Sequence, residues 1–190
     1  MATLGFIGTG NMGSALAKAA CNVLPSDQIF LANRTPSKAQ ILAEELECRV
    51  TDNEAIAEYA DLIFLGVKPQ MMADLLDEIA PILKKRESRF ILVSMAAGLT
   101  IARIQELAGG SYPVIRIMPN TPASIGEGMI LYTCSDDITK TEEKVFLERY
   151  SQQLNIYRKA ASSLLDIPQE KVECKLLALR CGKVITVPMA

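Results

Sequence analysis

The chain has 190 residues, of which 49% are apolar and 22% are charged, and 20 basic against 22 acidic side chains give a formal charge of −2. This length corresponds to one domain plus a remainder, and the composition excludes a fully disordered chain and a generally basic nucleic-acid-binding protein. Because the sequence contains no histidine, Ser-His-Asp triads, Cys-His dyads and imidazole metal sites are excluded as well.

Apolar runs alternate with helical patterns from the N-terminus to about residue 150. The predicted strands are 3–7, 28–32, 49–51, 62–67, 90–94, 114–118 and 129–133. The predicted helices are 14–23, 36–47, 53–59, 71–83, 101–108 (capped by Thr100) and 139–154. This alternation predicts an α/β fold, with a doubly wound, mostly parallel Rossmann-type sheet and helices on both faces.

The last forty residues do not continue the pattern. Residues 157–165 and 170–180 have helical patterns, and residues 182–187 have a strand pattern. We therefore divide the chain into a domain of residues 1–150 and an atypical tail of residues 151–190, which we expect to be helical with a short terminal strand.

A glycine-rich segment directly follows the first predicted strand. Residues 8–13 read GTGNMG and fit the G-x-G-x-x-G pattern, and a helix follows them. In this pattern the first glycine permits a tight turn, the second lets the backbone approach a pyrophosphate, and the third packs helix against strand. Amide groups at the start of the helix then face the phosphates. With both flanks correct, the segment predicts dinucleotide binding rather than a purely structural turn.

The end of the second predicted strand bears on which dinucleotide is bound. NAD-binding domains commonly place Asp or Glu there, whereas this chain has Asn33, Arg34 and Thr35, followed by Lys38. A guanidinium and an ammonium group attract a 2′-phosphate that a carboxylate would repel. The sequence thus predicts a preference for NADP(H), with NADH bound more weakly; the alternative is that both cations only form a solvated face.

Three further segments follow predicted strands. They read VKPQ (67–70), AAG (96–98) and MPNTP (118–122). Ligands of such folds bind beyond the carboxyl ends of the strands, and small residues at 96–98 would let a nicotinamide ring approach the backbone. On spacing alone, each segment is equally consistent with an ordinary strand-ending turn.

Taken together, the segments GFIGTGNMG, NR, VKPQ, SMAAG and RIMPNTPASIGEGM resemble pyrroline-5-carboxylate reductases over residues 1 to about 150. The resemblance implies hydride transfer from NADPH to the C=N carbon of 1-pyrroline-5-carboxylate, a small-molecule substrate, to give L-proline. It also implies that the glycine segment holds the pyrophosphate, that Asn33, Arg34 and Thr35 surround the 2′-phosphate, and that Asn53 contacts the cofactor. The family is homo-oligomeric. The chemistry mainly requires positioning of hydride donor and acceptor, so we assign no catalytic acid. The predicted cofactor-binding residues are Ile7, Gly8, Thr9, Gly10, Asn11, Met12, Gly13, Asn33, Arg34, Thr35, Lys38, Asn53, Val67, Lys68, Pro69, Gln70, Ala96, Ala97 and Gly98.

The resemblance does not extend to the family's second domain, which binds the substrate and builds the dimer. No DAxTxLSGSGPAY-like segment follows residue 150, although residues 182–187 look like the strand that precedes that domain. We therefore expect reduced activity from this chain alone. The alternative function is a non-catalytic NADP(H)-binding module or a regulatory or partner subunit.

The cysteines and the apolar runs indicate the cellular compartment of the protein. The five cysteines form no CxxC pair and have no zinc-like spacing, which favours small core residues in a reducing compartment, without a metal site. The longest apolar run, 90–102, is shorter than the ~20 residues that a bilayer requires. The N-terminus lacks the basic region of a signal peptide. We expect a cytoplasmic protein that binds no membrane and no nucleic acid.

Overall fold

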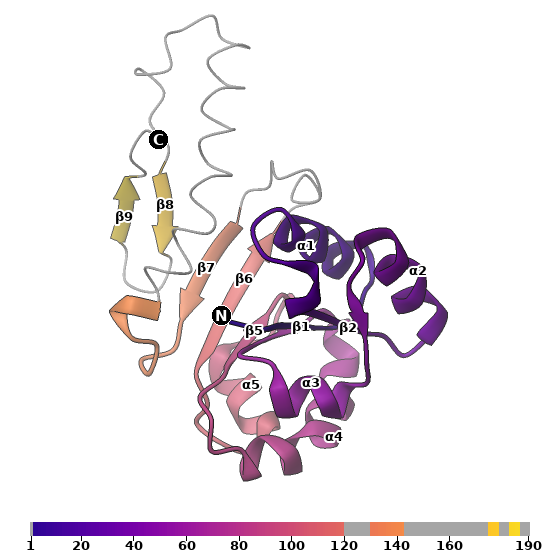
Figure 1. Ribbon diagram of the computed structural model, residues 1–190. Coiled ribbons are helices and arrows are strands. Elements are labelled where there is room, and N and C mark those ends of the chain that lie inside the picture. The colour runs from indigo at the N-terminus through magenta and orange to yellow at the C-terminus, as the bar shows by residue number, and fades with distance from the viewer. Residues whose placement is uncertain (1, 120–129, 143–174, 179–182, 187–190) are drawn as a thin grey trace, which may run out of the picture.

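The computed structural model describes residues 2–119, 130–142, 175–178 and 183–186 (Figure 1). Its strands are β1 (Leu4–Ile7), β2 (Ile29–Ala32), β3 (Arg49–Val50), β4 (Leu62–Leu65), β5 (Ile91–Ser94), β6 (Val114–Pro119), β7 (Ile130–Cys134), β8 (Lys175–Ala178) and β9 (Lys183–Thr186). Its α-helices are α1 (Asn11–Cys21), α2 (Pro36–Leu46), α3 (Asn53–Tyr59), α4 (Met72–Lys85) and α5 (Ile101–Ala108), with short 3₁₀ turns at η1 (Ser26–Gln28) and η2 (Pro69–Met71).

The strands form one sheet in the order β3-β2-β1-β4-β5-β6-β7-β8-β9. Strands β1 to β6 pair in parallel, whereas β7 is antiparallel to β6. The order of the first six strands is that of a Rossmann fold, in which the chain turns back at β1. The predicted fold class is confirmed, and the antiparallel direction of β7 could not be read from its apolar pattern.

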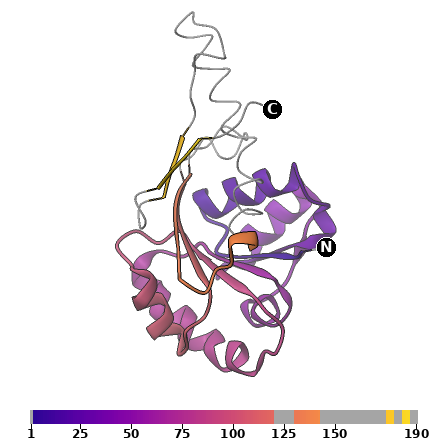
Figure 2. The same ribbon diagram turned by 90° about the vertical axis from the view of Figure 1, so that its left-hand side faces the viewer.

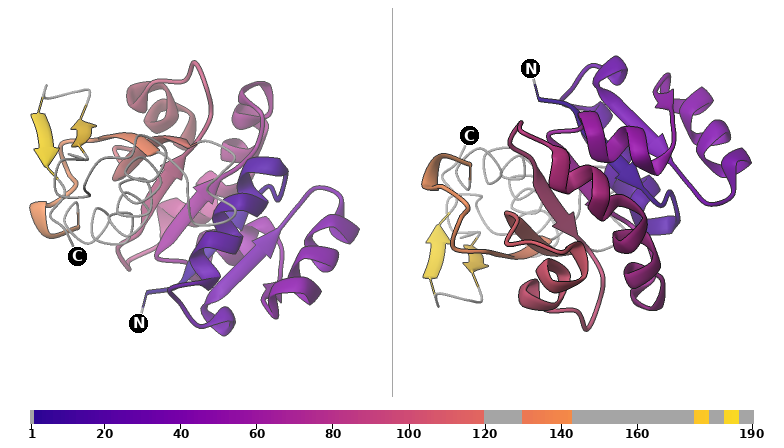
Figure 3. Two further views of the ribbon diagram at one scale, coloured as in Figure 1. Left: turned by 90° about the horizontal axis from the view of Figure 1, so that it is seen from above. Right: turned by 90° about the horizontal axis from the view of Figure 1, so that it is seen from below.

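Helices cover both faces of the sheet (Figures 1 and 3). On one face, α1 and α2 pack over a core that includes Phe6 and Phe64, whose rings stack with centroids 4.4 Å apart. On the other face, α3, α4 and α5 pack over a second core that includes Ile63 and Leu76. Figure 2 shows the sheet between these two layers. Burial of β1 and β4 from both faces explains why these strands read as apolar runs without alternation.

The helix ends follow the sequence signals. Asp52 caps α3 by accepting a hydrogen bond from the amide of Ala55 at 2.7 Å. Thr100 caps α5 as predicted, accepting from the amide of Arg103 at 3.2 Å. Gly109 ends α5 with φ of 73°, a left-handed conformation that glycine adopts without steric cost.

The segment after β7 begins as predicted. Residues 140–142 are helical, and Thr139 and Glu142 form a reciprocal capping box at their start. Arg89, just before β5, donates two hydrogen bonds to the carboxylate of Glu142 and lowers the pKa of Glu142 to about 2. The remainder of the predicted helix 139–154 lies outside the described residues.

The predicted tail is only partly described. The strand predicted at 182–187 is found as β9, which pairs antiparallel with β8. The helix predicted over 170–180 is wrong at residues 175–178, which form β8. A short apolar run fits a strand or a buried helix equally well, and here strand pairing with β9 decides between them. The helix predicted at 157–165 lies outside the described residues.

Within the described ranges, no helix combines the length and apolar character needed to span a membrane.

Candidate dinucleotide-binding site

The carboxyl ends of the parallel strands are aligned in one row across the sheet. Ile7, the last residue of β1, is paired in register with Ala32 of β2 and with Leu65 of β4. Leu65 is paired with Ser94 of β5, which in turn is paired with Arg116 of β6. The turns that follow β1, β2, β4 and β5 therefore emerge at the same edge, which is where ligands bind in open α/β sheets.

Backbone contacts fix the glycine turn against its neighbours. The amide of Gly8 donates to Ala32 O at 2.8 Å, and the amide of Gly66 donates to Ile7 O at 2.7 Å. Gly8 has φ of +97°, and a Cβ on it would lie 2.7 Å from the carbonyl of Gly66. A Cβ on Gly13 would collide with the carbonyl oxygen of Gly8. These contacts fit the roles predicted for the first and third glycines: a tight turn, and close packing of α1 on β1.

The second glycine stands in open space. Gly10 precedes α1, and a Cβ built on it would have no heavy atom of the described residues within 4 Å, apart from its chain neighbours. Asn11, which is exposed, and Met12, which is half-buried, form the first turn of α1. That turn has no acidic residue, and no side chain caps it. The backbone amides in the first turn of α1 can therefore be approached past Gly10. Such a helix start is suited to bind an anion.

Asn33 connects the first two turns of the row. Its side-chain Oδ1 accepts from the amide of Thr9 at 3.2 Å, and its Nδ2 donates to Thr35 O at 3.1 Å. The Thr9 side chain is buried, and its Oγ1 has no hydrogen-bond partner among the residues that the structure describes. The amide side chain of Asn33 therefore fixes the glycine turn relative to the start of α2. Sequence reasoning placed Asn33 at the cofactor and gave no indication of this connecting role.

The start of α2 presents cations without carboxylates. Arg34, Thr35 and Lys38 are exposed, and neither cation forms an ion pair with any residue that the structure describes. The first turn of α2 has no acidic residue, and no side-chain hydrogen bond caps it. Two positive side chains thus flank a helix N-terminus, where backbone amides and the helix dipole also favour an anion.

Asn53 lies on the first turn of α3 and is half-buried. Its Nδ2 donates to both carboxylate oxygens of Glu78 on α4, at 3.1 and 3.3 Å. The structure therefore links this predicted site residue to a carboxylate that sequence reasoning did not identify. No local pattern connects residues that are 25 positions apart on two different helices.

The two remaining predicted segments follow β4 and β5. Lys68, Pro69 and Gln70 are exposed, with Val67 half-buried before them. Ala96 is buried, whereas Ala97 and Gly98 are exposed in a turn before α5. Gly66 was absent from the predicted site, although it holds the turn after β4 directly against Gly8. The sequence signal that could have indicated Gly66 is its position directly after the apolar run 62–65.

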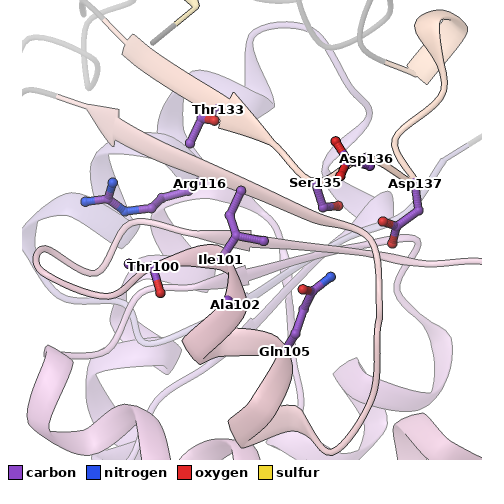
Figure 4. A pocket seen from close by; sticks show the side chains of 9 residues that line it. All are labelled: Thr100, Ile101, Ala102, Gln105, Arg116, Thr133, Ser135, Asp136 and Asp137. Carbon is purple, nitrogen blue, oxygen red and sulfur yellow. The ribbon is translucent and has the colours of Figure 1, made fainter. Parts of the chain in front are cut away.

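A separate hollow of about 410 Å³ lies between α5 and the strands β6 and β7 (Figure 4). None of the predicted cofactor residues lines this hollow, which is therefore distinct from the row of turns. Among the residues that the structure describes, the buried Nε of Arg116 and the buried Oγ1 of Thr133 have no hydrogen-bond partner. The residues that line the hollow are Thr100, Ile101, Ala102, Gln105, Arg116, Thr133, Ser135, Asp136 and Asp137.

The doubly wound sheet and the glycine turn after its first strand define a Rossmann-type α/β protein. Residues 3–98 match the family described as NADP oxidoreductase, coenzyme F420-dependent, and the chain belongs to this family.

Similar proteins agree with the resemblance found from the sequence. The pyrroline-5-carboxylate reductase of Corynebacterium melassecola is 39% identical over 136 residues, which are 70% of this chain and 50% of the relative. That of Escherichia coli K12 is 35% identical over 159 residues, 82% of this chain and 55% of the relative. The chain thus spans about half the length of these curated relatives.

Solved structures of proteins with the same name are also similar. The Plasmodium falciparum pyrroline carboxylate reductase, solved with NADP bound, has a TM-score of 0.68 at 26% identity and covers 87% of this chain and 63% of its own. The Coxiella burnetii pyrroline-5-carboxylate reductase has a TM-score of 0.72 at 24% identity, with 89% of this chain and 73% of its own covered, and supports the fold.

The two glycines of the turn should respond differently to alanine. Gly13→Ala places a Cβ against the carbonyl oxygen of Gly8, and we expect it to lower the free energy of unfolding by about 3 kcal/mol. Gly10→Ala places its Cβ in open space and should cost less than about 1 kcal/mol. Urea unfolding of both variants measures the difference. Equal losses would mean that the packing of α1 on β1 does not depend on Gly13.

Proposed function

We propose that the protein binds NADPH at the carboxyl edge of its sheet and supplies the cofactor-binding part of a reductase that converts 1-pyrroline-5-carboxylate into L-proline. The observation that carries the proposal is the register that aligns the four turns in one row. It brings an accessible helix start, an exposed pair of cations and a turn of small residues to one edge. The curated pyrroline-5-carboxylate reductases that match the chain supply the substrate and product.

The glycine turn fits a pyrophosphate. At Gly10 the backbone can be approached closely, because a Cβ there would meet no atom of the described part of the chain within 4 Å, its chain neighbours aside. No side-chain hydrogen bond caps the start of α1 in that part of the chain. These amides would hold the pyrophosphate oxygens, and Asn33 would keep the turn in position through its hydrogen bond to Thr9.

The start of α2 fits a 2′-phosphate. Arg34 can form charge-assisted hydrogen bonds to phosphate oxygens, and Lys38 adds a second positive charge one turn along the helix. Thr35 lies between them at the N-cap. This set of groups supports NADPH over NADH, because NADH lacks the 2′-phosphate that the two cations would bind.

The turns after β4 and β5 would face the nicotinamide end. Val67 to Gln70 follow β4, and Ala96 to Gly98 follow β5, where small side chains leave room for a flat ring beside the backbone. Asn53, held by Glu78, lies at the start of α3, which also follows a parallel strand.

Bound NADPH would supply the hydride for this reaction. The residues of the Ala96–Gly98 turn would hold the nicotinamide ring, and the chain would contribute by positioning this hydride donor relative to the C=N carbon of the substrate. A cyclic imine is readily protonated and is then electrophilic, so the reduction does not require a histidine, which this chain lacks. Orientation is therefore the main contribution that we assign to the protein.

The alternative, a non-catalytic NADP(H)-binding module, is less well supported, because the curated relatives described above are reductases. We further infer that the protein works in the cytoplasm and acts in proline biosynthesis. The thiols of Cys21 and Cys48 are not joined by a disulfide, which is consistent with a reducing compartment.

Cofactor choice should depend on Arg34. We expect wild-type protein to bind NADPH more tightly than NADH, and Arg34→Asp to weaken NADPH binding by roughly 1.5–3 kcal/mol through loss of charge-assisted hydrogen bonds. Lys84→Asp is the matched control, because Lys84 is exposed in the last turn of α4, away from the carboxyl edge, and the change in charge is the same. Fluorescence titrations with both cofactors measure this. Equal affinity of wild-type protein for NADPH and NADH would contradict the assignment.

The reaction itself is tested by following proline formation and NADPH oxidation with 1-pyrroline-5-carboxylate. Two proteins should be compared: this chain, and a chimera in which it is joined to the C-terminal part of the Escherichia coli relative. We expect turnover by the chimera and little or no proline from the chain alone, because orientation can contribute ~7–11 kcal/mol and needs a held substrate. NADPH affinity serves as the folding control. A chimera that binds NADPH yet forms no proline would favour the non-catalytic module.

A further inference from the structure

Two cysteines lie side by side at the edge of the sheet opposite the candidate site. Cys21 ends α1, and Cys48 lies between α2 and β3. Their Sγ atoms are 3.5 Å apart and share a hydrogen bond, and both side chains are half-buried. Since a disulfide requires an S–S distance of about 2.05 Å, the two sulfur atoms need to approach by about 1.5 Å.

Contacts other than the one between the two sulfur atoms hold α1 and α2 together. Lys18 of α1 forms an ion pair with Glu45 of α2 at 2.6 Å, one turn before each cysteine. Both helices also pack on the same core, with Cys21 and Cys48 at its margin. The ion pair and the shared core thus keep the two thiols close to one another.

We propose that Cys21 and Cys48 form a modification site that a small-molecule disulfide such as oxidised glutathione converts into an intramolecular disulfide. One cysteine thiolate attacks a sulfur of the oxidant, which releases one glutathione and leaves a mixed disulfide. The second cysteine thiolate attacks the protein sulfur of that mixed disulfide, so that the Cys21–Cys48 bond forms and the second glutathione leaves. The two protein sulfurs lose two electrons to the oxidant, and the two thiol protons end on the released glutathiones.

Burial raises the pKa of both thiols, and that of Cys48 rises to about 12. The thiolates that react are therefore scarce at neutral pH, and the oxidation is slow there. The raised pKa values distinguish these two cysteines from catalytic cysteines, whose pKa values are lowered. The appropriate experiment uses a mildly alkaline buffer and hours of incubation.

The disulfide would enclose the part of the chain that selects the cofactor. The segment between the two cysteines contains β2, the residues from Asn33 to Lys38, and α2. A cross-link over 27 positions restricts the unfolded chain and raises the melting temperature. Because α1 has 11 residues, Cys21 lies roughly 15 Å from the glycine turn. NADPH affinity should therefore change by less than about twofold, and this proposal does not depend on the proposed reaction.

The test incubates the full chain with oxidised glutathione, blocks the remaining thiols and digests with trypsin. We expect a reducible link between the peptides 19–34 and 39–49, which carry Cys21 and Cys48. We also expect a melting temperature higher by about 5–15 °C. Cys21→Ser and Cys48→Ser should each abolish both changes, whereas Cys134→Ser, the matched control, should leave them intact.

Three results would overturn the proposal. They are the absence of a link between Cys21 and Cys48, a link from either of them to another cysteine, and persistent mixed disulfides with glutathione at these positions. Each would mean that the two sulfur atoms do not approach to bonding distance. A linked pair without a rise in melting temperature would bear out the disulfide and show that the bond strains the native fold as much as it restricts the unfolded chain.

Discussion

The pairing of β1 with β2 on one side and with β4 on the other is the constraint on which the candidate site depends. Ile7 is opposite Ala32 and Leu65, so the three strands end at one level. The pairing continues beyond the strands, since the amide of Gly8 bonds to Ala32 O and that of Gly66 to Ile7 O. A shift of register by one residue would break these bonds and move the turns out of line.

The glycines follow from this backbone arrangement. Gly8 and Gly66 approach so closely that neither has room for a side chain, and Gly13 packs α1 against the same turn. Gly10 differs from them, because the protein itself leaves its side free. Three glycines therefore serve the fold and one leaves space for a ligand. Asn33 then joins the glycine turn to the start of α2, where Arg34 and Lys38 are exposed.

Much of the fold and the row of turns could be predicted from the sequence, because they depend on local signals. Buried parallel strands read as apolar runs, as in 62–65, and caps such as Thr100 mark helix starts. Contacts between distant residues could not be predicted. The link from Asn53 to Glu78 joins two helices, and Gly66 acts through space on Gly8. The helix expected over 170–180 was wrong at 175–178, because only pairing with the neighbouring strands β7 and β9 distinguishes a strand there.

The central claim is that the open backbone at Gly10 is where a dinucleotide pyrophosphate approaches the protein. Titration of the Gly10→Val variant with NADPH tests this most directly, with circular dichroism and melting temperature as folding controls. We expect native-like folding, because the new Cβ meets no atom of the described residues within 4 Å beyond its chain neighbours. We expect an affinity at least about 100-fold lower than that of wild-type protein. A folded Gly10→Val variant with wild-type affinity for NADPH would contradict the account, since the glycine turn would then be structural only.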